Sequence, residues 1–333
     1  MQRPVIAVFR GGYSGESVIS LQSAQRMMEA LDLQAYRPVY ISISDKVWSC
    51  EDPGERPLPL DRGGMQVDLG DGPSKIAAAL IAIHGSPGED GKLQGYLDML
   101  GVPYQTGDVL NMSITFSKFA TIALLKQQEF PVASSILLHK GSPVDHKAIL
   151  ELGLPVFVKP DRSGSSLGVS KVKKAEELQG ALDLAFQECE QVLVEAGVTG
   201  RELTCGVVRI NGEVKALPVC EIRTSREFFD FEAKYHAADT EEIVPAPLPA
   251  HITRMVQERS EAIYSAFACR GMVRVDHFWT GGDDAGSLLT IELNTVPGFS
   301  KASIFPKMIE AAGLSVAGVV NGLVWGMVGA HEE

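Results

Sequence analysis

The sequence has few cysteines and no short biased repeat. No two of its five cysteines form a C-x-x-C pair, and the number is odd. Neither a zinc ribbon nor a closed disulfide framework is therefore indicated, and we expect buried, reduced thiols in a cytoplasmic protein. The hydrophobic content of 45% also excludes a collagen-like or disordered chain. At about 150 residues per domain, the length predicts two or three domains.

Positive charge is also scarce. The chain has 30 Lys and Arg against 42 Asp and Glu, a net charge of −12, and it has no basic tract. This argues against a partner such as a nucleic acid or an anionic membrane surface, because phosphate contacts need clustered Lys and Arg. A small nucleotide site needs only a few local cations and stays possible. The N-terminal apolar run is too short for a signal peptide.

One apolar stretch, residues 311–330, has nearly the length of a membrane span. Gly318, Gly322 and Gly326 repeat there at four-residue spacing, a pattern that is typical of packed transmembrane helices. Gly313 and Ser315 instead predict a helix stop and a new N-cap, which would divide the stretch into two helices. We therefore expect a buried helix in a soluble protein, with the glycines allowing close backbone approach.

The order of elements predicts an α/β chain. A strand at 5–9, a Gly-rich turn and a helix at 18–31 are followed by a second strand–turn–helix unit from residue 79 to 100. This recurrence is typical of a doubly wound, Rossmann-like sheet. The rest predicts two α+β subdomains, and the expected domains are 1–107, 108–197 and 198–333.

Two late strands carry the strongest chemical pattern. Residues 273–278 and 289–294 both alternate apolar and polar side chains, and a Gly/Asp turn separates them. If the strands pair, Arg274 and Asp276 share a face, and Glu292 and Asn294 join it. Two carboxylates and an amide suit Mg²⁺. The alternative is a polar strand face that is merely solvated.

A Gly/Ser-rich loop at 161–168 follows the strand that ends with Lys159. Small residues allow backbone N–H groups and hydroxyls to close over phosphate oxygens. Neither a G-x-x-x-x-G-K-[ST] nor a G-x-G-x-x-G motif is present. From these residues alone, the sequence predicts only a magnesium-nucleotide enzyme of unknown substrate.

An ordered set of motifs, together spanning almost the whole chain, then resembles the ATP-grasp superfamily and, within it, the D-alanine–D-alanine ligase family. The motifs are GGYSGESVISL at 11–21, HGSPGEDGKLQGYLDMLGVPYQTG at 84–107, VKPDRSGSSLGVSKV at 158–172, VLVEAGVTGRELT at 192–204, FFDFEAKY at 228–235, RVDHF at 274–278 and ELNTVPGFSKASIFP at 292–306. Each motif is degenerate by itself, but the ordered set is specific.

The resemblance implies a role for individual residues. It implies metal ligation of two Mg²⁺ or Mn²⁺ ions by Asp276, Glu292 and Asn294. It implies ATP contacts from Lys118, Lys159, Ser166, Glu195, Glu202 and Lys234. It implies D-alanine contacts from His84, Gly298, Ser303 and Ile304, and catalytic roles for Glu16, Ser165, Tyr235 and Arg274.

The implied reaction joins two D-alanines through an acyl phosphate, with ATP as co-substrate, for peptidoglycan synthesis. Family membership further implies a cytoplasmic homodimer. A D-alanine–D-lactate ligase and a nucleotide-binding protein without activity are the alternatives. The sequence departs from the family pattern at Ser163, where an acidic residue is frequent, and at Ala196 and Gly197, where Lys and a bulky aromatic are common. It also has Ser17 and Val18 where the family usually has Arg-Glu after the glutamate of the first loop.

Overall fold

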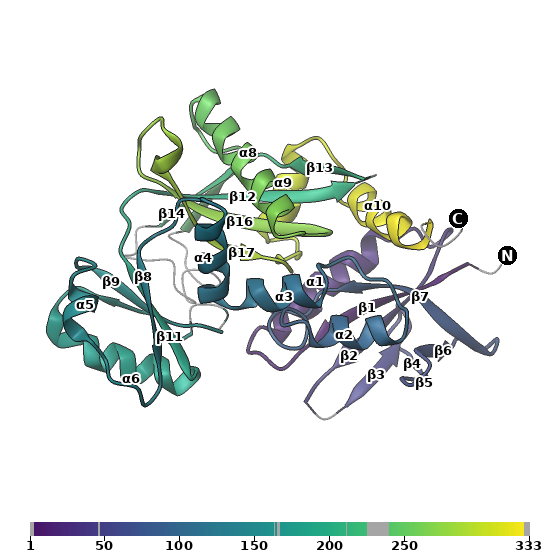
Figure 1. The fold of residues 1–333 in the computed structure, drawn as a ribbon. Helices are drawn as coiled ribbons and strands as arrows, with labels where there is room; N and C mark the ends of the chain where they lie inside the picture. Colours follow the sequence, from purple (N-terminus) through teal and green to yellow (C-terminus); the bar gives the residue numbers. More distant parts are fainter. Residues whose placement is uncertain are drawn as a thin grey trace.

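The chain folds into three β-sheets with flanking helices (Figure 1). The computed structural model describes residues 3–45, 47–162, 164, 167–210, 212–224 and 240–329. The free thiols of Cys50, Cys205, Cys220 and Cys269 are buried and that of Cys189 is partly buried, so the expectation of reduced, largely buried cysteines is confirmed.

The first sheet has a parallel centre with antiparallel edges. Its strands run in the order β4 (Pro57–Leu58), β3 (Trp48–Glu51), β2 (Arg37–Ile43), β1 (Val5–Gly11), β7 (Pro73–Ile81), β6 (Gln66–Asp68) and β5 (Leu60–Asp61). β1 is parallel to β2 and to β7, as the doubly wound prediction requires. Alternate residues of β1 enter two different cores, one with helix α1 (Ser17–Ala30) and one with α2 (Lys92–Met99). Helices therefore cover both faces, which explains why the strand is a continuous apolar run.

The second sheet is small and antiparallel. Its order is β10 (Ser170–Val172), β9 (Val156–Pro160), β11 (Gln191–Ala196) and β8 (Ser135–His139). One face, through Val156, Val158 and Val194, packs on α5 (His146–Leu150) and α6 (Leu178–Glu188), which a 3₁₀ turn, η1 (Ala175–Glu177), precedes. The opposite face, which carries Phe157, Lys159 and Glu195, lines a cleft.

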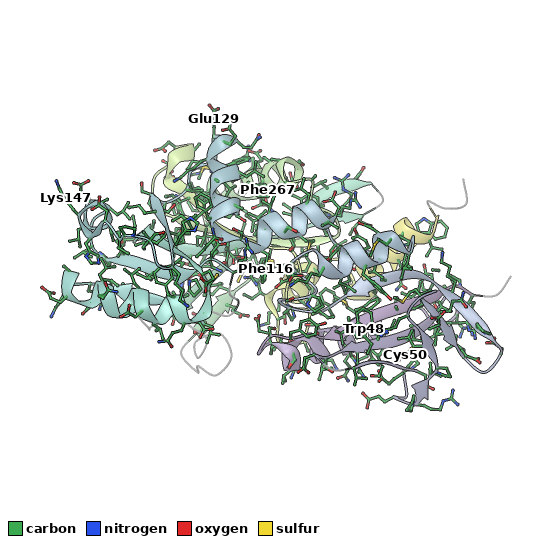
Figure 2. The ribbon with its side chains drawn as sticks, turned by 60° about the horizontal axis from the view of Figure 1, so that its bottom comes forward. Trp48, Cys50, Phe116, Glu129, Lys147 and Phe267 are labelled. Carbon is green, nitrogen blue, oxygen red and sulfur yellow. The ribbon has the colours of Figure 1, made fainter. Side chains whose placement is uncertain are left out.

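The third sheet is antiparallel and forms the opposite wall. Its order is β15 (Thr240–Ile243), β14 (Cys220–Thr224), β12 (Arg201–Ile210), β16 (Met272–Trp279) and β17 (Leu288–Asn294), with β13 (Glu213–Ala216) also paired to β12 and the 3₁₀ turn η2 (Ala285–Ser287) before β17. α8 (Ala250–Ala266) and α4 (Lys118–Gln127) cover one face. α3 (Val109–Phe116) leads into α4, and Phe116 lies near the centre of the molecule (Figure 2).

The first and third sheets share a hydrophobic core. α9 (Ile304–Ala311) and α10 (Val316–Val328) lie between them (Figure 1), and Phe305 and Val320 pack in one cluster with Met27 of α1 and Met272 of β16. α4, which follows the first predicted domain, packs on the third sheet through Leu125. The three domain ranges stay predictions, because this packing joins segments from different ranges.

The apolar C-terminal stretch is divided as its sequence predicts. Gly313 has a left-handed φ of 72°, and the Ser315 hydroxyl accepts a hydrogen bond from Gly318 N at 2.9 Å as the N-cap of α10. Among the described residues no single helix is long and apolar enough to span a membrane, although α9 and α10, bent by 99°, pass that test as a pair.

The expected role of the glycine stripe is wrong. A Cβ atom on Gly326 would meet nothing within 4 Å, and one on Gly318 would meet only the Ser315 hydroxyl. One on Gly322 would make ordinary contact, at 3.4 Å, with Ile210. α10 instead binds α1 through Asn321, whose amide donates to Ala30 O at 2.8 Å and accepts from Asp32 N at 2.9 Å.

We expect opposite effects from two substitutions on α10. Asn321→Ala removes the bonds to α1 and should lower the free energy of unfolding by about 1 kcal/mol. Gly326→Ala fills open space in a helix and should raise it by about 0.5–1 kcal/mol. Urea unfolding measures the free energy of unfolding of both variants. If Gly326→Ala destabilises the protein, the glycines do serve close helix packing after all.

Candidate active site

The second and third sheets enclose a cleft with a volume of about 1360 Å³. Loops from the first sheet close one end of it, so all three sheets contribute to its lining. Residues predicted for the site that line it are Glu16, His84, Lys118, Lys159, Glu195, Glu202, Arg274, Asp276, Glu292, Asn294, Gly298, Ser303 and Ile304. The structure therefore brings these thirteen residues together.

The third-sheet wall is built by the two late strands. β16 and β17 are antiparallel neighbours, with Arg274 opposite Asn294 and Asp276 opposite Glu292. Directly opposed residues of a ladder project from the same face, so the prediction that these four side chains share one face is confirmed. The register shifts immediately after Asp276, so the alternation is interrupted beyond the four residues.

Asp276 is the most heavily bonded side chain of this wall. Arg274 donates to both of its carboxylate oxygens at 2.8 Å, and Asn294 Nδ2 donates to Oδ2 at 3.0 Å. Thr204 Oγ1, on β12, donates to Oδ1 at 2.5 Å. The carboxylate is 7% exposed, so these donors replace the water that burial removes. Among the described residues no group of three or more His, Cys, Asp and Glu could hold a metal ion. The carboxylates of Asp276 and Glu292 and the Asn294 amide are the protein groups that could ligate a metal here, with water and phosphate as the other ligands.

The second-sheet wall carries the paired charges of Lys159 and Glu195. They lie on adjacent strands β9 and β11, on the same face as Phe157, and form an ion pair. Burial acts to lower the pKa of Lys159, but Glu195, Glu292 and Glu202 together outweigh it, and the pKa lies above its usual value. Lys159 therefore remains a cation within the cleft.

The loop after β9 reaches toward the first sheet. A Cβ atom on Gly164 would lie 2.5 Å from Glu16 Oε2, so the loop backbone is packed against that carboxylate. A side chain at position 164 would require the Glu16 carboxylate to shift. Ser163, Ser165, Ser166, Lys234 and Tyr235 lie outside the described residues, and the expectations for them stay predictions.

The loop after β7 of the first sheet contributes two titratable groups, of which His84 is buried and Glu89 is partly exposed. His84 is 6% exposed, and its Nε2 lies 3.4 Å from the Ser23 hydroxyl. Burial lowers the pKa of His84, against the pull of Glu16, so the imidazole is neutral at neutral pH. Burial, and next the charge of Glu16, raises the pKa of Glu89 to about 8. Gly85 N donates to Glu89 Oε2 at 2.6 Å, which fixes the turn after His84.

The N-terminus of α9 borders the same end of the cleft, since Phe299 N donates to the Ser23 hydroxyl beside His84 at 3.0 Å. Ser303 is its N-cap residue, and its hydroxyl accepts from Ser300 N at 3.0 Å. A Cβ atom on Gly298 would lie 3.0 Å from Ser303 Oγ, so these two positions are adjacent. The N–H groups of a helix N-terminus attract a carboxylate.

The departures at Ala196 and Gly197 have a structural basis. Gly197 N donates to Pro155 O at 2.8 Å, and a Cβ atom on Gly197 would lie 2.5 Å from that oxygen. An aromatic side chain at position 197 would therefore require the backbone to move. Apolar lining at this end of the cleft comes instead from Ala133, Phe157, Phe278, Leu289 and Ile291.

Three polar features of the site were missed by sequence reasoning. Thr204 lies about 70 residues before Asp276 along the chain, and no local pattern links them. Glu89 lies within the GEDG motif at 88–91, and this motif could have indicated it as a site residue. Glu221, on β14, accepts from Arg201 at 2.6 and 2.7 Å and from Arg223 at 2.8 Å; against burial, these bonds hold its pKa below the usual value.

Comparison with known proteins assigns the chain to one family. The family described as "D-ala D-ala ligase N-terminus" matches residues 5–107, and "D-ala D-ala ligase C-terminus" matches residues 124–325. A D-alanine–D-alanine ligase of Porphyromonas gingivalis is 40% identical over 322 residues, 96% of each chain. One of Bacteroides fragilis is 38% identical over 320 residues, 96% of this chain and 98% of its own.

Solved structures agree with these relatives. The D-alanine–D-alanine ligase of Coxiella burnetii superposes with a TM-score of 0.86 at 28% identity, covering 100% of this chain and 96% of its own. The VanG D-Ala:D-Ser ligase of Enterococcus faecalis gives 0.85 at 30%, covering 98% and 100%. A Bacillus anthracis D-alanine–D-alanine ligase complexed with ATP gives 0.78 at 28%, covering 99% of each chain.

The second and third sheets, with the cleft between them, thus make up an ATP-grasp fold that follows the doubly wound first sheet, as predicted. The chain belongs to the D-alanine–D-alanine ligase family.

The raised pKa of Glu89 predicts a pH-dependent stability. Between pH 4.5 and about 8, the folded protein keeps a proton that the unfolded chain has lost, so the free energy of unfolding should fall as pH rises. Glu89→Gln should flatten this slope in urea titrations, whereas Glu213→Gln, at an exposed position, should not. An unchanged slope in Glu89→Gln would mean that Glu89 is already ionised at low pH.

Proposed function

We propose that this protein uses ATP to join two D-alanines into D-alanyl-D-alanine through an acyl phosphate, releasing ADP and phosphate for peptidoglycan precursor synthesis. The observation that carries the proposal is the face formed by Arg274, Asp276, Glu292 and Asn294 in a cleft that Lys118 and Lys159 also line. Family membership and the ATP complex of the Bacillus anthracis relative support it.

Lys118 and Lys159 bind the triphosphate of ATP. Lys118 begins α4 and Lys159 lies near the end of β9, so the cations come from two different elements. Phosphoryl transfer needs charge neutralisation and alignment more than covalent help, and two fixed ammonium groups supply both. Glu195 and Glu202 contact the adenine and ribose end, and Ser166 and Lys234 add phosphate contacts.

Asp276, Glu292 and Asn294 hold two Mg²⁺ or Mn²⁺ ions. Their donor chemistry fits, because carboxylate and amide oxygens on opposed strands suit a hard cation that takes its other ligands from water and phosphate. Arg274, which binds both oxygens of Asp276, already places positive charge beside this carboxylate. When bound, the ions neutralise charge on the β- and γ-phosphates.

Glu16 and His84 bind the first D-alanine, with Glu16 paired to its ammonium group. The substrate carboxylate oxygen then bonds to the γ-phosphorus, the bridging P–O bond breaks, and ADP leaves. Ser165 and Tyr235 complete the hydrogen-bonded set around Glu16. The contact of Gly164 with Glu16 supports a loop that closes over this step and excludes water from the acyl phosphate.

The second D-alanine attacks the acyl carbon with its amine, and phosphate leaves. Arg274, which its bonds to Asp276 hold in place, stabilises the oxyanion together with the Gly298 backbone. Ser303 and Ile304, at the N-terminus of α9, border the carboxylate of this substrate. Family membership also supports a cytoplasmic homodimer.

The identity of the second substrate has two alternatives. D-Lactate would give an ester in place of the peptide. D-Serine is suggested by the similarity to the Enterococcus faecalis VanG ligase. The curated relatives at 37–40% identity are D-alanine–D-alanine ligases, which favours D-alanine.

The test is phosphate release from ATP with Mg²⁺ and D-alanine, with L-alanine, D-serine and D-lactate as the other acceptors. The wild-type protein should be most active with D-alanine alone. Glu292→Ala should reduce release by about a hundredfold or more, because charge neutralisation at the phosphates is lost. Glu213→Ala, at an exposed position of the same sheet, is the matched control and should keep full activity. Full activity of a folded Glu292→Ala protein would refute the proposed metal set.

A further inference from the structure

Asp161 is a buried carboxylate at the junction of the two cleft walls. It follows β9 directly, two residues after Lys159, and its side chain is 1% exposed. Its backbone N–H donates to Gln191 O at 2.9 Å, which fixes it to β11. Asp161 is therefore a rigid part of the second sheet, although no role has been assigned to it above.

Arg162 Nε lies 3.6 Å from Oδ2 of Asp161, and the carboxylate is also bonded to the start of α4. The Ser117 hydroxyl donates to its carboxylate oxygens at 2.8 and 3.1 Å, and Phe119 N donates to Oδ1 at 2.8 Å. Lys118 N lies 3.2 Å from Asp161 O, as a donor to it. One residue thus binds all three consecutive residues centred on Lys118.

The two elements that Asp161 connects otherwise pack in different cores. α4 packs through Leu125 with Tyr264 and Val273 of the third-sheet core. β9 packs through Val158 on the α6 side of the second sheet. The relative position of Lys118 and Lys159 therefore depends on a contact between separately packed bodies.

The chemistry of this contact makes it strong. Hydrogen bonds to an ionised carboxylate are shorter and stronger than hydrogen bonds between neutral groups. Burial increases the free energy that is lost when such a bond is broken. The negative charge also lies at the positive N-terminal end of α4. Ser117 adds to the chain of bonds, since its hydroxyl caps α4 by accepting from Ala120 N at 3.1 Å.

We propose that Asp161 is a positioning residue that sets the spacing of Lys118 and Lys159 and thereby the affinity for the nucleotide phosphates. The inference rests on the proposed function for the assignment of both lysines to phosphate. Asp161 contacts neither substrate in this proposal, but it fixes the positions of the two lysines relative to each other.

Asp161→Asn tests the proposal, because it keeps the shape and removes the charge and one acceptor. The dissociation constant for ADP with Mg²⁺, from calorimetry on the full chain, should rise about tenfold or more. The KM for ATP should rise similarly, while the KM for D-alanine changes by less than about twofold. Ser117→Ala should give part of the same loss, and the double variant should lose less than the sum of both. Ser117→Thr, which keeps a hydroxyl, should restore affinity.

Two controls separate positioning from loss of structure. Asp145→Asn makes the same change at the N-cap of α5, outside the cleft, and should leave ADP affinity unchanged. Leu125→Ala loosens the packing of α4 without touching Asp161 and should lower the active fraction rather than the affinity. Wild-type ADP affinity in folded Asp161→Asn, or an equal affinity loss in Leu125→Ala, would overturn the proposal. A wild-type protein that binds ADP but forms no D-alanyl-D-alanine would instead overturn the proposed function.

Discussion

The site depends on the compensation of negative charge in a partly buried strand pair. Asp276 and Glu292 lie opposite each other on β16 and β17, where two bare carboxylates would repel. Arg274, Asn294 and Thr204 surround Asp276 with donors and make this arrangement compatible with a stable sheet. Both carboxylates line the cleft, and Lys159 lies in its other wall.

The arrangement of the sheets places these compensated charges in the cleft. The apolar sides of the second and third sheets pack on helices, and the remaining faces meet across the cleft. Lys159 stays charged because Glu195 lies beside it. The first sheet adds Glu16 and His84, and its shared core with α9 and α10 holds this end of the cleft against the third sheet. In the proposed function the nucleotide lies between the second and third sheets, whereas the residues of the first sheet contact D-alanine.

The features that depend on residues close together in the sequence could be predicted from local patterns. The pairing of the two late strands followed from alternation and a Gly/Asp turn, and the break in the C-terminal stretch followed from Gly313 and Ser315. Contacts between distant segments could not be predicted in this way. Thr204 reaches Asp276 from another strand, Asp161 reaches α4, and the shared core of the first and third sheets joins the two ends of the chain. The glycine stripe misled for the same reason, because spacing alone does not say what faces the glycines.

The most direct test of the account is an anomalous difference map from crystals grown with Mn²⁺ and ADP. The account predicts manganese peaks bound by Asp276 and Glu292, with the ADP phosphates beside Lys118 and Lys159. Manganese away from both carboxylates, or ADP bound outside the cleft, would contradict it.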